Sequence, residues 1–229
     1  MSEAANRPGG RDPTQQGVVL LHGIGRPLRS FGKMQAAIEA SGFATLNIGY
    51  AGRRKPLEAL ADDIEPAIGR FADGIAGSVH FVGHSMGGLL ARVYLAKYRP
   101  ARLGRVVMLG TPNGGSEIAD RLKNFPPYRA IFGPAGQQLV TKRDAATNRS
   151  LARIEYPVGI IAGNRSIYPI SSTFVLPKPN DGRVSVDSTR LDGMADHIVI
   201  ATSHPWLVRN AAAIDQTIAF LRDGRFSRP

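Results

Sequence analysis

The 229-residue sequence contains no cysteine. Disulfides, thiolate metal sites and a cysteine nucleophile are therefore excluded. It also lacks an apolar run of about 18 residues, so no membrane-spanning helix is expected. Residues 1–16 contain no apolar core segment, so they do not fit a secretory signal, and we expect a disordered tail there. Together these absences predict a cytoplasmic protein.

Acidic residues are few, 18 against 29 Lys and Arg, which gives a formal net charge of +11. Such a charge can attract an anionic surface, either lipid headgroups or nucleic acid. The alternative is a solvated surface rich in Arg, and the dispersal of the basic residues favours it. The short run Arg53-Arg54-Lys55 has no aromatic residues interleaved for base stacking, so nucleic acid is not an expected partner. Peripheral contact with an anionic membrane surface stays open.

Short apolar stretches alternate with helical patterns along the chain. The strand-like stretches cover residues 17–23, 43–50, 78–84, 104–110, 157–163 and 196–202. Near-continuous apolar strands separated by helices are typical of parallel sheets that are covered on both faces. The sequence therefore predicts an α/β fold with a mostly parallel sheet of about six strands, flanked by helices on both faces.

Capping and breaking residues suggest where the helices lie. Ser30 is expected to cap a helix that stops near Gly42. Pro56 suits the first turn of a second helix, which Pro66 is expected to kink or divide. The last helix is expected over residues 206–222.

Two segments interrupt the alternation of strands and helices. Residues 113–153 carry no strand pattern, and residues 164–184 are rich in Ser and Pro. Long irregular segments in a compact domain are usually functional loops or mobile covers, although each could be a plain surface loop. We expect one domain over residues 17–229, with a cap at 113–153.

The stretch VHFVGHSMGG, residues 79–88, continues a buried-strand pattern into three glycines around Ser85. A very tight turn explains this composition, because Gly83 and Gly87 would relieve collisions between side chains on either side of the serine. Such a turn exposes the serine hydroxyl for nucleophilic attack. The alternative is a turn serine without a catalytic role.

Ser85 is one of four polar features that follow predicted strands. The others are the segments 22–25 (HGIG) and 180–182 (NDG), and His204 after the sixth strand. In open parallel sheets the chemistry takes place beyond the carboxyl ends of the strands. The chain order Ser, Asp, His is one that serine enzymes use.

These residue types support nucleophilic catalysis together. Ser85 needs a neutral imidazole, here His204, to accept its proton. A carboxylate, here Asp181, fixes the imidazole tautomer and stabilises the imidazolium. The backbone N–H groups of Ile24 and Met86 are placed to stabilise the oxyanion.

The sequence resembles the α/β-hydrolase family, most closely its compact bacterial lipases and esterases. The matching stretches are VVLLHGIG (18–25), VGHSMGGLLARVYL (82–95), LGTPNGGSEIA (109–119), NDGRVSV (180–186) and SHPWL (203–207). The resemblance implies an α/β-hydrolase fold, Ser85 as nucleophile, and Asp181 and His204 as its partners. It also implies oxyanion donors at Ile24 and Met86. The spacing of 23 residues between Asp181 and His204 is similar to that in the compact lipases.

Other histidines and acids compete for these roles. His197 opens the sixth strand, at the wrong end for chemistry. His22 is expected to orient the oxyanion loop, His84 to pack or hydrogen-bond, and His80 to be a packed strand residue with a partner. The acids that compete with Asp181, which the Asn-Asp-Gly turn favours, are Asp187, Asp192 and Asp196.

No cluster of residues has convincing metal-ligand spacing, and no phosphate-binding glycine loop is present, so we expect no metal and no cofactor. The predicted activity is hydrolysis of carboxylic esters, small-molecule or lipid, through an acyl-enzyme. The residues that could line an acyl pocket, or simply anchor the cap, are Phe125, Tyr128, Ile131, Phe132 and Leu139. The alternatives are a thioesterase or acyltransferase with the same residues, and a non-catalytic binding protein on this fold.

Overall fold

The computed structural model describes residues 14–151 and 154–228. In this part of the chain six strands form one sheet in the order β2-β1-β3-β4-β5-β6, and every neighbouring pair is parallel. The strands are β1 (Gly17–Leu21), β2 (Ala44–Ile48), β3 (Val79–His84), β4 (Leu103–Leu109), β5 (Val158–Gly163) and β6 (Asp196–Ile200). The predicted parallel sheet is confirmed.

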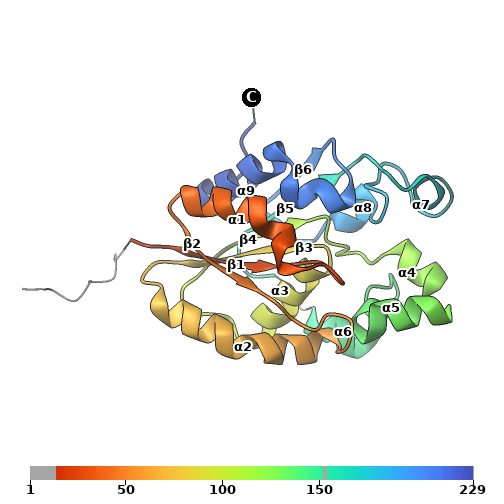
Figure 1. Cartoon of the computed structure of the whole chain (residues 1–229), viewed down its shortest axis with the longest axis horizontal. Helices are drawn as coiled ribbons and strands as arrows, with labels where there is room; N and C mark the ends of the chain where they lie inside the picture. Colours follow the sequence, from red (N-terminus) through yellow and green to blue (C-terminus); the bar gives the residue numbers. More distant parts are fainter. Residues whose placement is uncertain (1–13, 152–153, 229) are drawn as a thin grey trace, which may run out of the picture.

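Helices cover both faces of this sheet (Figure 1). On one face, α1 (Gly32–Ala40) and α9 (Ala211–Asp223) pack on Val18 and Leu20. On the other face, α2 (Leu57–Gly74) and α3 (Met86–Lys97) pack on Val19 and Leu21. Successive side chains of a strand point to opposite faces, so the fully apolar β1 serves two cores.

Two predicted features of the first helices differ from the structure. Ser30 caps no helix, because it lies inside the 3-10 turn η1 (Leu28–Phe31) that precedes α1. Gly42 follows the end of α1 with a φ of +94°, as a stop signal should. The division predicted at Pro66 is wrong, since α2 is continuous across it.

The last helix also starts later than predicted. Residues 204–209 form a 3-10 turn, η2 (His204–Arg209), and α9 begins only at Ala211. The Asn210 side chain accepts a hydrogen bond from the Ala213 N–H, so the real capping residue is Asn210.

The predicted tail, residues 1–16, lies mostly outside the described residues. Its last residues join the domain, because Ala44 N donates to the Gln16 carbonyl oxygen and Gly77 N donates to that of Gln15.

The segment predicted as a cap contains short helices and, in its described part, no strand. They are α4 (Glu117–Leu122), α5 (Pro126–Gln137), which is broken at Gly133, and α6 (Ala145–Ser150). Two further short helices, α7 (Pro169–Phe174) and α8 (Val186–Thr189), lie between β5 and β6 in the sequence. Figure 1 shows α4 and α5 at the end of the sheet where the strands finish, with α7 across from them. The two segments therefore flank the edge at which the chemistry was predicted.

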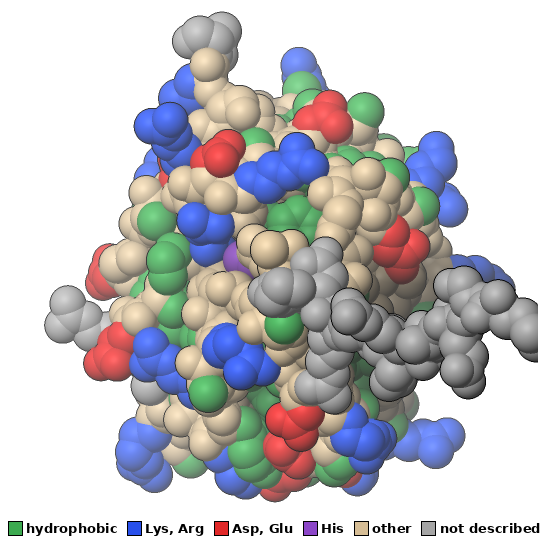
Figure 2. Space-filling model, turned by 90° about the vertical axis from the view of Figure 1, so that its left-hand side faces the viewer, with side chains coloured by type: hydrophobic (Ala, Val, Ile, Leu, Met, Phe, Trp, Pro, Cys, Tyr) green, Lys and Arg blue, Asp and Glu red, His purple; other side chains and the backbone are tan. Residues whose placement is uncertain are grey.

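None of the described helices is both long and apolar enough to cross a lipid bilayer. On the face drawn in Figure 2, Lys and Arg side chains lie over the whole surface, among acidic, hydrophobic and other side chains. That arrangement agrees with the dispersed basic residues of the sequence.

Candidate active site

Ser85 occupies a strained turn between β3 and α3. Its φ of 56° and ψ of −124° make it the one non-glycine residue of the described chain with positive φ. Such backbone is costly for a residue with a side chain, and it concentrates at functional sites. The neighbouring glycines are required: a Cβ on Gly87 would lie 2.0 Å from the Leu21 carbonyl oxygen, and one on Gly83 would lie 2.5 Å from Gly88 Cα.

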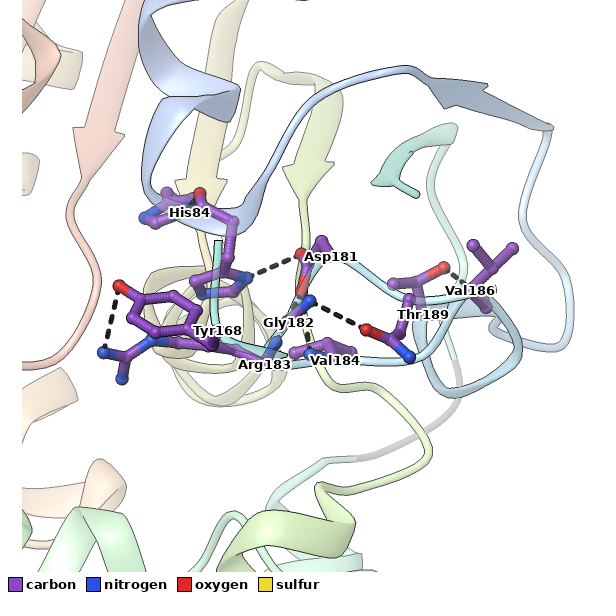
Figure 3. Close-up of polar contacts among 10 residues, drawn as sticks. His84, Tyr168, Asp181, Gly182, Arg183, Val184, Val186 and Thr189 are labelled. Atoms are coloured by element: carbon purple, nitrogen blue, oxygen red, sulfur yellow. Dashed lines mark hydrogen bonds and ion pairs between the residues drawn. The ribbon is translucent and has the colours of Figure 1, made fainter. Parts of the chain in front are cut away.

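Asp181 and His204 form a buried pair at the carboxyl ends of the strands. His204 Nδ1 lies 2.7 Å from Asp181 Oδ2, and both side chains are almost fully buried. Asp181 Oδ1 accepts hydrogen bonds from the N–H groups of Arg183 (2.9 Å) and Val184 (2.8 Å). Figure 3 shows the Asp181 carboxylate enclosed by the backbone of this turn. These contacts require Asp181 to present Oδ2 to the imidazole.

His84 packs against His204 and forms a hydrogen bond with its backbone. Its Nε2 lies 3.0 Å from the His204 carbonyl oxygen, and the two rings are 4.8 Å apart. Burial, followed by the neighbouring His204, holds the pKa of His84 well below its ordinary value. His84 is therefore neutral and donates from Nε2, which confirms the expectation that it packs and hydrogen-bonds.

The competing acids lie elsewhere. Asp196 forms an ion pair with Arg228 at the start of β6. Asp187 is exposed on α8 beside Arg190, and Asp192 is exposed. His197 Nε2 lies 3.0 Å from Thr189 Oγ1, away from Ser85. Of the candidates weighed from the sequence, Asp181 is the acid that the fold brings to His204.

The backbone amides of Ile24 and Met86 have the features that the predicted role of oxyanion donor requires. Met86 is the first residue of α3, where N–H groups are left without intrahelical partners and the helix dipole is positive. Within residues 14–151 and 154–228, no group accepts a hydrogen bond from the amide of Ile24 or of Met86. Both amides are thus available for an oxyanion.

His22 is packed beneath the loop that carries Ile24. Its ring stacks on Tyr50 at 4.2 Å with an interplanar angle of 4°, and its Nδ1 lies 2.9 Å from the Gly23 carbonyl oxygen. Burial lowers the pKa of His22, so the ring is neutral. This packing supports the predicted orienting role.

A cavity of about 250 Å³ opens beside the serine, and both Ser85 and His204 line it. Its apolar wall includes Ile24, Ile118, Leu122, Tyr128, Phe132 and Leu139. Tyr128, Phe132 and Leu139 thus lie where the sequence suggested. Ile118 and Leu122 were missed, although their spacing of four on a short helix was a usable signal.

Phe125 does not line this cavity, contrary to the prediction. It precedes the first turn of α5, and its side chain is 54% exposed. Ile131 lines a second cavity of about 260 Å³ instead. The residues that line both cavities are Ile24, Ser85, Phe132, Tyr168, Arg183 and His204.

In the described part of the chain, no three His, Asp or Glu side chains are grouped so that they could hold a metal ion. The polar side chains that line the two cavities with Ser85 include those of Arg26, Arg53, His84, Ser116, Tyr168, Arg183 and His204.

Comparison with known proteins assigns the family. A family model described as the alpha/beta hydrolase fold matches residues 18–145, more than half of the chain. The protein therefore belongs to the α/β-hydrolase family, which confirms the resemblance found in the sequence.

Curated relatives match only part of the chain. It is 35% identical over 111 residues to proteins named triacylglycerol lipase from Pseudarthrobacter phenanthrenivorans and Burkholderia plantarii. The matches cover 48% of this chain and 32% and 29% of those proteins, so it spans about a third of their length.

Solved structures show the same fold over most of the chain. A Bacillus licheniformis lipase in its mature form is 21% identical with a TM-score of 0.65, covering 87% of this chain and 89% of that one. A Legionella pneumophila phospholipase is 15% identical with a TM-score of 0.67, covering 90% and 62%. At these identities the likeness concerns the fold.

Proposed function

We propose that this protein is a serine hydrolase that cleaves carboxylic esters, of the lipase or esterase type, through an acyl-enzyme. The observation that carries the proposal is the buried Asp181–His204 pair beside the same cavity as the strained Ser85 turn. The names of the curated relatives, triacylglycerol lipases, support the ester class of substrate.

The chemistry follows from the arrangement of these groups. Ser85 Oγ attacks the ester carbonyl while His204 Nε2 accepts the hydroxyl proton. Asp181, bonded to Nδ1–H, keeps the imidazole in the tautomer that leaves Nε2 free to accept. The amides of Ile24 and Met86 stabilise the negative oxygen. His204 then protonates the leaving alcohol. In the second half of the reaction, water attacks the acyl-enzyme with His204 as the base, and the carboxylic acid is released.

The apolar cavity fits the acyl portion of such an ester. Its wall is aliphatic and aromatic, and burying one methylene there contributes about 0.8 kcal/mol. A lipid substrate is compatible with this wall, and contact with an anionic lipid surface stays a prediction of the net charge of +11.

The test is covalent labelling with a fluorophosphonate, read by intact-mass spectrometry. The wild type should gain one adduct, and Ser85→Ala should gain none. Ser116 is the matched control, because its hydroxyl caps α4 in the same cavity, so Ser116→Ala should still be labelled. Equal labelling of Ser85→Ala, or none of the folded wild type with and without detergent, would refute the proposal.

A further inference from the structure

The second cavity at Ser85 differs in chemistry from the first. Three arginines line it together with Ser85 and His204: Arg26 and Arg53, which do not line the first cavity, and Arg183, which borders both. No Asp or Glu is among its lining residues. A concave surface with charge of one sign concentrates ions of the opposite sign. This cavity therefore favours a negatively charged group within reach of the candidate nucleophile.

Arg53 is held against the oxyanion loop. A Cβ on Gly25, which has a φ of +65°, would lie 2.5 Å from Arg53 Nη2, so the bare glycine makes room for the guanidinium. The backbone of Arg53 also lies close to α5, since a Cβ on Gly133 would lie 1.7 Å from the Arg53 carbonyl oxygen. The basic run noted in the sequence thus passes between the Ile24 loop and α5.

Arg183 lines the same cavity. It follows the Asp181 turn, and its guanidinium carbon lies 4.9 Å from the centroid of the Tyr168 ring. Its Nη2 also lies 3.5 Å from the Tyr168 hydroxyl (Figure 3). A cation over an aromatic face is attracted to it, which fixes the position of this charge.

Arg26 completes the group. Its Nε is buried and has no hydrogen-bond partner in the described chain. Its charge, like that of Arg183, contributes to the low pKa of His84, after burial and His204. Both cations therefore act electrostatically on the site.

The three arginines also lack acidic counter-ions. The ion pairs of the described residues use Lys55, Lys97, Arg99, Arg190, His204 and Arg228 as their basic partners. What distinguishes these three arginines is that they line one cavity together. The guanidinium fork matches phosphate oxygens in a bidentate manner.

We propose that this cavity binds a phosphate group on the leaving-group side of the substrate, so that the preferred substrate is an acyl ester of a phosphorylated alcohol. The inference rests on the proposed function. The acyl chain occupies the apolar cavity and the phosphorylated alcohol occupies the arginine cavity, and His204 borders both. That placement brings the leaving oxygen to the imidazole that must protonate it.

The reaction leaves the phosphate ester intact. Ser85 Oγ forms a bond to the acyl carbon, the acyl C–O bond breaks, and the serine proton passes through His204 to the leaving oxygen. Water then attacks the acyl-enzyme and restores the serine proton. One ester and one water give one carboxylic acid and one phosphorylated alcohol.

The test compares two substrates that differ only in the phosphate, 1-octanoylglycerol 3-phosphate and 1-octanoylglycerol, both monomeric. We expect kcat/KM to be about tenfold higher or more for the phosphate at low salt, with the preference falling as KCl is added. Arg53→Gln and Arg183→Gln should each reduce the preference by about tenfold. Arg54→Gln is the matched control: it removes the same charge from the adjacent residue, which lines neither cavity. It should keep the wild-type preference.

Two results would overturn the proposal. One is a wild type without preference for the phosphate ester. The other is that Arg54→Gln loses as much of the preference for the phosphate ester as Arg53→Gln does. That result would assign the preference to the overall charge of +11.

A binding measurement separates this inference from the proposed function. Ser85→Ala should bind glycerol 3-phosphate in calorimetry, and the double variant with Arg53→Gln should bind it about tenfold more weakly. If neither ester is cleaved, the proposed function fails, but the binding measurement still tests the anion site. If Ser85→Ala does not bind glycerol 3-phosphate, the anion-site proposal is overturned. Faster cleavage of the phosphate ester in phosphatidylcholine vesicles than as monomer would assign the phosphate to a lipid headgroup. The reverse would assign it to a soluble ester.

Discussion

At the scale of single residues, the site depends on how one carboxylate is held. Asp181 Oδ1 is occupied by two backbone N–H donors, and only Oδ2 faces the imidazole. In addition, the backbone N–H of His204 donates to the backbone carbonyl oxygen of Asp181, at 3.0 Å. The orientation of the carboxylate is therefore determined by the backbone and not by the histidine.

That arrangement gives a sharp expectation for Asp181→Asn. Two N–H donors require the amide oxygen at the Oδ1 position, so the amide nitrogen must face His204 Nδ1. The imidazole then carries its proton on Nε2 and cannot accept one from Ser85, so kcat for ester hydrolysis should fall by about 10³ to 10⁴. KM should change little, because Asp181 itself does not line the acyl cavity. Steady-state kinetics on a soluble ester measures both.

Asp187→Asn is the matched control for this variant. It makes the same substitution on an exposed residue six positions away, whose side chain is 81% exposed. Its kcat should equal that of the wild type. A fall in Asp187→Asn as large as that in Asp181→Asn would contradict the assigned pair.

At the scale of elements, the segment predicted as a cap is joined to the core by the half-buried guanidinium of Arg143. Arg143 donates to the carbonyl oxygens of Gln138 (3.1 Å), Asn113 (2.7 Å) and Pro112 (2.7 Å). It thereby ties the end of α5 to the loop after β4. Burial, with the nearby charge of Arg92, lowers the pKa of Arg143 to about 10, so it stays charged at neutral pH.

Arg143→Gln should loosen this cap. The carbonyl oxygens of Asn113 and Gln138 would lose their partner, at a cost on the order of 1–3 kcal/mol for each buried group. Amides of residues 126–139 should exchange hydrogen at least about tenfold faster, and KM for an acyl ester should rise because Tyr128 and Phe132 move. Hydrogen-exchange mass spectrometry measures the first effect. Arg149→Gln, on exposed α6 surface, should leave exchange unchanged, and unchanged exchange in Arg143→Gln would refute the link.

The same elements show what a sequence can and cannot predict. Strands were predictable because runs such as GVVLL are apolar at every position, which only a strand covered on both faces needs. Ser85, Asp181 and His204 were predictable because each follows a strand. The start of α9 and the continuity of α2 across Pro66 were not, because a side-chain cap or tertiary packing outweighs local propensity.

Cavity linings follow the same logic. The position of Phe125 was predicted wrongly because the placement of α4 and α5 depends on the break at Gly133 and on the contacts of Arg143. Neither feature can be read from a local sequence pattern. The arginine cavity combines residues 26, 53 and 183, and no local pattern links positions so far apart in the sequence.

At the scale of the whole molecule, another buried histidine, His80, lies near the amino end of β3, away from the candidate site. His80 Nδ1 accepts the N–H of Arg105 on β4 at 2.9 Å, so Nε2 carries the proton and faces Gln16 Oε1 at 2.6 Å. His80 therefore ties together β3, β4 and the segment that leads into β1. Burial, aided by the charge of Arg105, lowers the pKa of His80 to about 4.

This contact should make the stability of the fold depend on pH. The unfolded chain protonates His80 near its ordinary pKa of about 6.5, while the folded protein keeps it neutral down to about pH 4. Between these values the unfolded state binds more protons, so the free energy of unfolding should fall as pH drops. The loss from this residue is roughly 3 kcal/mol, taken over about 2.5 pH units. Urea unfolding of the wild type and His80→Gln between pH 7 and 4 measures it. The wild type should lose that much more than the variant, because every other titrating group is common to both proteins. Parallel pH slopes would mean that folded His80 takes up its proton near pH 6.5 and that its burial does not govern stability in acid.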